Sequence, residues 1–166
     1  MNTDYNKILI DLISITGNKY ILSGKWDKQP YINGWRYGNG DALAIVKPGC
    51  LLEMWKVLEI CVNADVIVIM QAANTGLTGG STPYGNDYER PVVIINTLRI
   101  NDIHLINNAK QIISLSGGTL YDLENKLKPF NRDPHSVIGS TSIGASIVGG
   151  VCNCLLYTSP SPRDRG

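Results

Sequence analysis

The sequence lacks the features that mark several large classes of protein. Only 7% of the 166 residues are aromatic, 17% are charged, and the net charge is +1. Acids and bases are interspersed along the chain, so we expect no nucleic-acid partner. The longest apolar runs, such as residues 66–70 and 92–95, are far shorter than the roughly 20 residues of a membrane-spanning helix. We therefore expect no transmembrane segment.

Cysteine is also scarce. Cys50, Cys61, Cys152 and Cys154 show no paired C-x-x-C spacing, and Asp87 and Glu89 have no histidine neighbour at ligand spacing, so we expect no metal site. No basic-then-apolar leader follows Met1, which predicts no signal peptide and a reducing, cytoplasmic setting. The cysteines before residue 154 are expected to be buried small hydrophobic residues.

Hydrophobic periodicity predicts a mixed chain of the α+β class. Helices are expected over residues 5–16, 51–64 and 120–127. Strands are expected over residues 42–46, 66–70 and 92–96, with a hairpin of residues 104–106 and 111–115. The unbroken apolar run of residues 66–70 predicts a strand covered on both faces. Residues 26–40 read as an irregular connection.

A few side chains invite a functional interpretation that the sequence does not support. Trp26, Trp35, Tyr31 and Tyr37 lie near basic residues, and we expect them to pack on the domain rather than meet a membrane, because large aromatic side chains chiefly contribute buried area. His104 is expected at a strand edge and His135 in a turn. Neither has a visible acid or nucleophile partner, so neither is assigned to catalysis.

Glycine is the one abundant feature, and it is unevenly spread. Many of the 17 glycines fall in residues 71–81 and 139–150, where serine and threonine alternate with them. A buried strand that ends in small residues leaves backbone N–H groups free, and such groups can bind phosphate oxygens. Two such segments could hold a long diphosphate ligand between them.

Neither segment matches a common phosphate-binding or nucleophile motif. The sequence has no G-x-x-x-x-G-K-[ST] stretch, and Gly38 and Gly40 lack the third glycine of a dinucleotide fingerprint. Val148 stands where a nucleophile elbow around Ser146 needs a glycine. Glycine-rich surface loops are common, so a non-catalytic nucleotide-binding module remains open.

Several ordered strings make a longer pattern. They are residues 40–44, 48–55, 70–78, 80–83, 85–88, 134–140 and 143–146. Together they closely resemble the quinone-dependent D-lactate dehydrogenases of bacterial respiratory membranes, from about residue 5 to residue 153. The agreement is ordered and nearly uninterrupted, which makes it more specific than any single glycine motif.

The resemblance implies a two-subdomain FAD-binding domain of the type shared by p-cresol methylhydroxylase and vanillyl-alcohol oxidase, here truncated, with FAD between the subdomains. It also implies which residues bind the FAD. They are Ala72, Ala73, Asn74, Thr75, Gly76, Gly80 and Ser81 in the first segment, and Gly139 and Ser146 in the second. The substrate and base residues of such enzymes lie mostly beyond this chain, so no catalytic residue is named.

The implied activity is oxidation of D-lactate to pyruvate, with a hydride passed to the flavin and electrons passed on to a membrane quinone. The full-length protein would lie on the cytoplasmic side of the inner membrane as a peripheral protein in contact with the membrane surface. An enzyme of the same fold that acts on another 2-hydroxy acid, such as glycolate, stays open.

The last residues do not continue the pattern. Residues 154–166 contain Pro160 and Pro162 without apolar periodicity, and the string resembles a translated transposase sequencing adapter. We expect residues 1–153 to be the incomplete N-terminal part of the FAD-binding domain and residues 154–166 to be an artefactual tail. The fragment is then expected to be inactive by itself, and an inert translation of a chimeric sequence is a further alternative.

Overall fold

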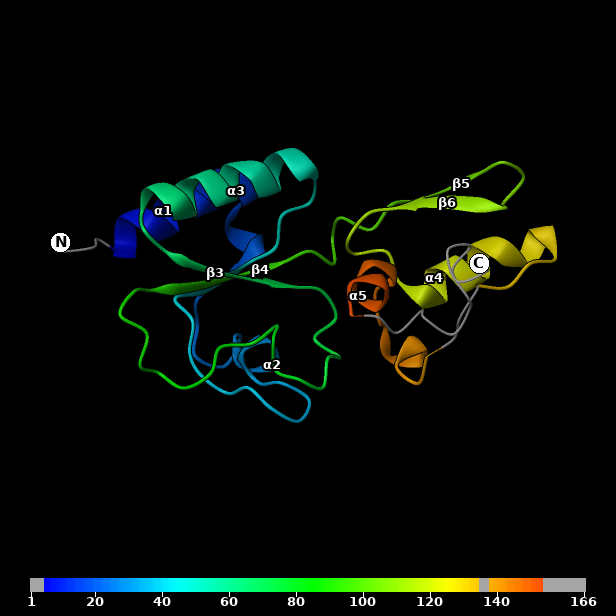
Figure 1. Ribbon diagram of the computed structural model, residues 1–166. Coiled ribbons are helices and arrows are strands. Elements are labelled where there is room, and N and C mark those ends of the chain that lie inside the picture. The colour runs from blue at the N-terminus through cyan, green and yellow to red at the C-terminus, as the bar shows by residue number, and fades with distance from the viewer. Residues whose placement is uncertain (1–4, 135–137, 154–166) are drawn as a thin grey trace, which may run out of the picture. The chain divides into compact units, whose positions relative to one another are not determined.

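The computed structural model describes residues 5–134 and 138–153. The chain divides into two compact units, Met1–Ile100 and Asn101–Gly166 (Figure 1). Both units mix helices with strands, so the α+β class predicted from the sequence is confirmed. The predicted turn at His135 and the predicted tail at residues 154–166 lie outside the described residues and stay predictions.

The first unit is built on a four-stranded sheet with the order β1-β2-β4-β3. Its strands are β1 (Ile21–Leu22), β2 (Ala44–Val46), β3 (Ile67–Gln71) and β4 (Val92–Asn96). β2, β4 and β3 run parallel, and β1 pairs antiparallel with β2. The predicted strand-helix-strand unit is present, but β4 lies between its two strands.

Helices cover the two faces of this sheet unequally. α1 (Tyr5–Thr16) and α3 (Leu51–Asn63) lie together on one face, and α2 (Gln29–Ile32) lies on the other (Figure 1). The 3₁₀ turn η1 (Asn18–Tyr20) follows α1. The helices predicted over residues 5–16 and 51–64 are confirmed, whereas α2 was not predicted because a four-residue helix that begins Gln29-Pro30 shows no periodicity.

β4 is the centre of the hydrophobic core. Val93 and Ile95 pack with α1 and α3, whereas Val92 and Ile94 belong to the cluster on the α2 side. Successive side chains of a strand point to opposite faces, so a strand covered on both faces needs an unbroken apolar run. All five residues of β4 are buried.

The prediction that residues 66–70 form a strand buried on both faces is wrong. β3 is the edge strand of the sheet, and it pairs only with β4 among the described residues. Its central residues are half-buried and Met70 is exposed. An apolar run shows that a segment is a strand, but its place in the sheet depends on the topology.

The second unit consists of a hairpin and short helices. Its elements are β5 (Ile103–Ile106), β6 (Gln111–Ser114), α4 (Leu120–Leu127), η2 (Lys128–Phe130), η3 (Thr141–Ile143) and α5 (Ile147–Cys152). The predicted hairpin and the helix over residues 120–127 are confirmed. The Thr119 hydroxyl accepts a hydrogen bond from the Asp122 N–H and caps α4, as its sequence position predicted.

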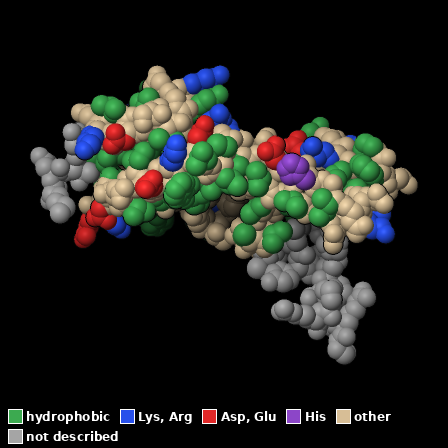
Figure 2. Space-filling view, turned by 90° about the horizontal axis from the view of Figure 1, so that it is seen from above, with side chains coloured by type: hydrophobic (Ala, Val, Ile, Leu, Met, Phe, Trp, Pro, Cys, Tyr) green, Lys and Arg blue, Asp and Glu red, His purple; other side chains and the backbone are tan. Residues whose placement is uncertain are grey.

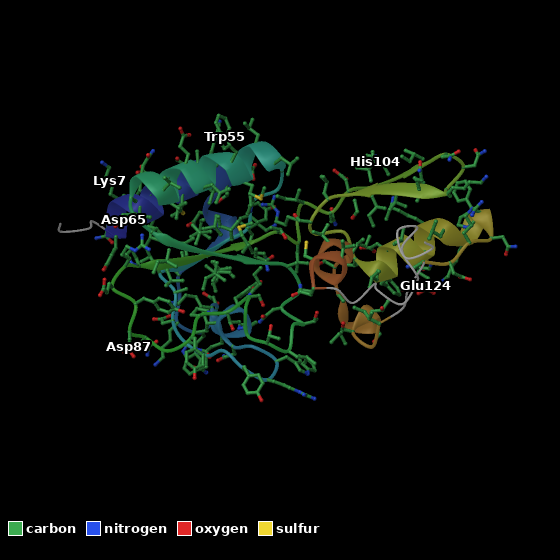
Figure 3. The ribbon with its side chains drawn as sticks, in the orientation of Figure 1. Lys7, Trp55, Asp65, Asp87, His104 and Glu124 are labelled. Carbon is green, nitrogen blue, oxygen red and sulfur yellow. The ribbon has the colours of Figure 1, made fainter. Side chains whose placement is uncertain are left out.

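Several large hydrophobic side chains lie on the surface of the first unit. The exposed group includes Trp55 on α3, which points away from the sheet (Figure 3), and hydrophobic and charged side chains are interspersed on the face shown in Figure 2. Trp26 is 80% exposed, Trp35 65% and Tyr37 66%. The prediction that the aromatic group packs on the domain is therefore wrong for these three, and Tyr31 alone packs against the core.

Among the described residues, no helix is long and apolar enough to cross a membrane.

A buried lysine anchors the connection that leads into β2. Lys28 is 8% exposed, and its Nζ donates hydrogen bonds to the Asp41 carboxylate, at 2.7 Å, and to the Ala42 carbonyl. Partial burial would raise the pKa of Asp41. The hydrogen bonds from Lys28 and from the Ala42 N–H, with the charges of Lys28 and Lys25, outweigh it and hold that pKa below its ordinary value.

We expect Asp41→Asn to change how stability depends on pH. A carboxylate with a lowered pKa stabilises the fold above its unfolded pKa, and this contribution is lost as the pH falls through the folded pKa. Urea unfolding at pH 7, 5 and 3 should show a smaller loss of stability on acidification in Asp41→Asn than in the wild type. The effect is small because the Asp41 side chain is 65% exposed. Asp87→Asn, at a carboxylate that pairs with no described cation, should behave as wild type.

We also expect the two paired isoleucines, Ile69 of β3 and Ile94 of β4, to contribute unequally to the stability of the fold. Ile94 is fully buried, whereas its register partner Ile69 is half-buried. Ile94→Ala should lower the free energy of unfolding by about 3–5 kcal/mol, and Ile69→Ala by about half of that or less. Equal losses in urea denaturation would contradict the central position of β4.

Candidate functional site

The first glycine-rich segment leaves the sheet at the carboxyl end of β3. Because β2, β3 and β4 are parallel, their carboxyl ends lie at the same edge, and ligands of such sheets bind outside that edge. The segment of residues 72–81, here called the β3 loop, therefore begins where parallel-sheet proteins place ligands. The chain then returns to β4 without any intervening helix.

The start of the β3 loop presents backbone donors. Within the described part of the chain, none of the N–H groups of residues 72–76 donates a hydrogen bond. These residues are half-buried up to Thr75, and Gly76 is exposed. Successive free N–H groups form a concave positive surface that suits phosphate oxygens.

Buried polar side chains at the ends of β3 and β4 hold the β3 loop in place by hydrogen bonds. Gln71 is 3% exposed, and its Nε2 donates to the carbonyls of Tyr31, at 2.8 Å, and Ser81, at 2.7 Å. The buried Asn96 side chain donates to the Ala72 carbonyl at 2.9 Å. Both amides have their donors satisfied, which buried polar groups require.

Glycines of the loop fall into two kinds. A Cβ added to Gly76 would meet nothing within 4 Å, and one added to Gly80 only the Thr78 hydroxyl at 3.9 Å. A Cβ on Gly79, at φ +76°, would lie 3.0 Å from the Tyr37 carbonyl oxygen. Gly79 is therefore needed for packing, whereas Gly76 and Gly80 leave free space in front of the backbone.

The second glycine-rich segment is partly helical, which corrects its expected form as one loop. Gly149 and Gly150 lie inside α5, where glycine is disfavoured by about 1 kcal/mol relative to alanine. Ser146 is buried and caps this helix, since its hydroxyl accepts from the Gly149 N–H at 3.1 Å. Periodicity could not predict α5 because half of its first four residues are glycine.

Ser146 and Gly139 differ in their surroundings. The backbone around Ser146 is fixed, since Leu120 N–H donates to the Ala145 carbonyl and Ile147 N–H to that of Gly118. Gly139 is exposed, and a Cβ there would meet nothing within 4 Å. Both residues belong to the second unit, whereas residues 72–81 belong to the first.

The second unit also contains a cavity of about 580 Å³. Leucines of α4, with Ile147 and Val151 of α5, form much of its lining, and no predicted cofactor residue takes part. Lys110, Arg132 and Asp133 also line it, beside the apolar side chains.

The remaining candidate side chains show no arrangement for catalysis. His104 lies on β5 with an exposed side chain (Figure 3), as predicted for a strand edge. Cys61 is buried, and burial raises the pKa of its thiol to about 11, so the thiol stays protonated. The expected burial is wrong for Cys50 and Cys152, which are exposed; Cys154 lies outside the described residues. No group of metal-binding side chains occurs in residues 5–134 and 138–153.

Sequence reasoning missed the network formed by Gln71, Asn96 and Thr97. The Thr97 N–H donates to the Gln71 carbonyl at 2.8 Å, and Asn96 is 1% exposed. A usable signal was present, because each of two neighbouring apolar strands ends in a polar residue. Polar side chains at the ends of buried strands must find partners, and here they find them in the loop.

Several solved structures share the fold of this chain. The chain superposes on p-cresol methylhydroxylase with a TM-score of 0.74 at 17% identity, and on alkyldihydroxyacetonephosphate synthase with a TM-score of 0.79 at 15% identity. Each comparison covers 91% of this chain and 30% of the other. The likeness shows the fold alone, and the predicted fold of the p-cresol methylhydroxylase and vanillyl-alcohol oxidase type is confirmed.

Curated proteins are much more similar in sequence. The chain is 58% identical over 147 residues to the quinone-dependent D-lactate dehydrogenase of Haemophilus influenzae, and 54% identical over 151 residues to that of Escherichia coli. These matches cover 89% and 91% of the chain but 26% of each relative, so the chain spans about a quarter of their length. No protein-family model matches the chain. The resemblance seen in the sequence strings is confirmed. Over most of its length, this chain is similar to quinone-dependent D-lactate dehydrogenases.

Proposed function

We propose that the chain is the FAD-binding part of a D-lactate dehydrogenase that oxidises D-lactate to pyruvate and passes electrons to a quinone. The observation that carries this proposal is the identity of 58% over 147 residues with a protein named for that activity. The flavoprotein fold supports it. The complete reaction would need the parts present in the full-length relatives, of which this chain spans about a quarter.

The β3 loop fits the phosphates of FAD. The free N–H groups of residues 72–76 offer donors, and the open space at Gly76 and Gly80 lets phosphate oxygens approach the backbone closely. The Thr75 hydroxyl adds a further donor without a partner among the described residues. Ala72, Ala73, Asn74, Thr75, Gly76, Gly80 and Ser81 would thus contribute mainly through their backbone.

Gly139 and Ser146 would form the second contact with FAD. Ser146 has a fixed backbone and a hydroxyl that keeps its own proton for donation while it accepts from Gly149. Gly139 leaves open space for a close approach.

The chain's own contribution is to bind and orient the cofactor. When bound, FAD supplies the two-electron acceptor for oxidation of the 2-hydroxy acid. Fixed backbone dipoles compensate the phosphate charge without reorganisation, and we assign no proton-transfer residue within this chain.

The proposal extends to the organisation and location of the full-length protein. Residues 1–153 would be the N-terminal part of its FAD-binding domain. The protein would work as a peripheral protein at the cytoplasmic face of the inner membrane, where a quinone is within reach. The names of the relatives support the choice of quinone.

Gly76→Ala tests the β3 loop as the phosphate site. A methyl group there meets nothing in the protein, so the urea midpoint should stay as in the wild type. The same methyl group would obstruct phosphate oxygens, so affinity for FAD should fall at least about tenfold, equivalent to about 1.4 kcal/mol. Quenching of flavin fluorescence on titration of the purified chain measures this.

Gly79→Ala is the matched comparison, since it should lower stability through its positive φ and its contact with Tyr37. If the wild-type chain leaves flavin fluorescence unchanged on titration, the proposal that this chain binds FAD is contradicted. Unchanged affinity in Gly76→Ala would instead remove the β3 loop from the site.

A further inference from the structure

The Asn74 side chain is fully used inside the protein. Its Nδ2 donates to the carbonyls of Asn33, at 2.8 Å, and Pro30, at 3.3 Å. Its Oδ1 accepts a hydrogen bond from the Ser81 hydroxyl at 2.9 Å. A side-chain amide has two N–H donors and one carbonyl acceptor, so no donor of Asn74 is left for a ligand.

Gln71 repeats this arrangement three residues earlier. Its Nε2 donates to the carbonyls of Tyr31 and Ser81 at 2.8 and 2.7 Å. Gln71 and Asn74 thus connect the same three pieces of chain: the α2 region, the start of the β3 loop, and the end of that loop at Ser81. The loop is closed on itself and held to α2 by two amides.

The backbone of Asn74 explains why asparagine suits this position. Its φ is +55°, in the left-handed region that glycine and asparagine tolerate better than other residues. Glycine would allow the turn without any clamp, and most other side chains would strain it. Asparagine supplies both the turn and the clamp.

We propose that Asn74 is a positioning residue, which together with Gln71 fixes the β3 loop so that the N–H groups of residues 72–76 point outward toward the cofactor phosphates. This rests on the proposed function. A clamped loop binds its ligand without a loss of conformational freedom at that moment, which strengthens binding. In the alternative arrangement the Asn74 amide is itself a ligand of the cofactor and holds nothing in place.

The two arrangements differ in the protein without ligand. If Asn74 clamps the loop, Asn74→Gly frees residues 73–80 even when no cofactor is present. If Asn74 is only a ligand, the same change weakens binding and leaves the free loop as rigid as before. Gly adopts the required φ without strain, so Asn74→Gly should fold.

The experiment measures ¹⁵N relaxation of the unliganded chain and its titration with FAD, for the wild type and three variants. In Asn74→Gly we expect backbone order parameters of residues 73–80 to fall from about 0.85 to below about 0.6, and FAD affinity to fall at least tenfold. Ser81→Ala removes one of the three hydrogen bonds of the Asn74 side chain, the one that the Ser81 hydroxyl donates. It should give an intermediate loss of order.

Asn131→Gly is the matched control. Asn131 is exposed and has a φ of +52°, so it undergoes the same substitution in the same backbone region, within the second unit. It should leave the order of the β3 loop and the FAD affinity unchanged.

Three results would overturn the proposal. They are weaker FAD binding with unchanged order in Asn74→Gly, lower order with unchanged affinity, and no change in either. If the wild type binds no FAD, the proposed function fails; the order parameters then decide separately whether the clamp exists.

Discussion

A buried amide at the end of an edge strand constrains much of the first unit. Gln71 has almost no contact with solvent, yet it carries donors and an acceptor that need partners. The α2 region and the end of the β3 loop provide carbonyl oxygens for it. Satisfying one side chain therefore brings together segments separated by 40 and 10 positions in the sequence. The loop conformation is a consequence of that requirement.

The same constraint separates two roles that residues of one loop can have. Donors that satisfy buried groups, such as the amides of Gln71, Asn74 and Asn96, face inward. Backbone N–H groups of residues 72–76 stay without a protein acceptor. Side chains thus hold the loop while the backbone provides the recognition surface, and glycine is needed only where the backbone itself is approached or crowded.

Prediction from the sequence succeeded where one local rule decides the outcome. α1, α3 and α4 have the apolar spacing of helices, and Thr119 caps α4. It failed where tertiary context decides. β3 has the apolar run of a central strand but lies at the edge, and α5 forms despite two glycines because Ser146 caps it and pairs with Thr119.

The candidate site was predicted as a set of positions, but the function of each side chain was not. The resemblance placed Asn74 and Ser81 in the cofactor site. The structure adds that the Ser81 hydroxyl donates a hydrogen bond to the Asn74 side chain. Gln71 was part of the first glycine-rich segment but was assigned no role, because a polar residue after an apolar strand can equally be solvated. Only the three-dimensional paths of α2 and of the β3 loop reveal its partners, the carbonyls of Tyr31 and Ser81.

The strand order of the first unit has a consequence for synthesis on the ribosome. β4 is the last of its four strands in the chain, yet both β2 and β3 pair with it and not with each other. Until residue 96 has emerged, the parallel sheet has no central strand, and the apolar surfaces of α1 and α3 have only part of their final cover. Incomplete sheets with unpaired edges are prone to association. The nascent chain is therefore prone to association until β4 inserts between β2 and β3.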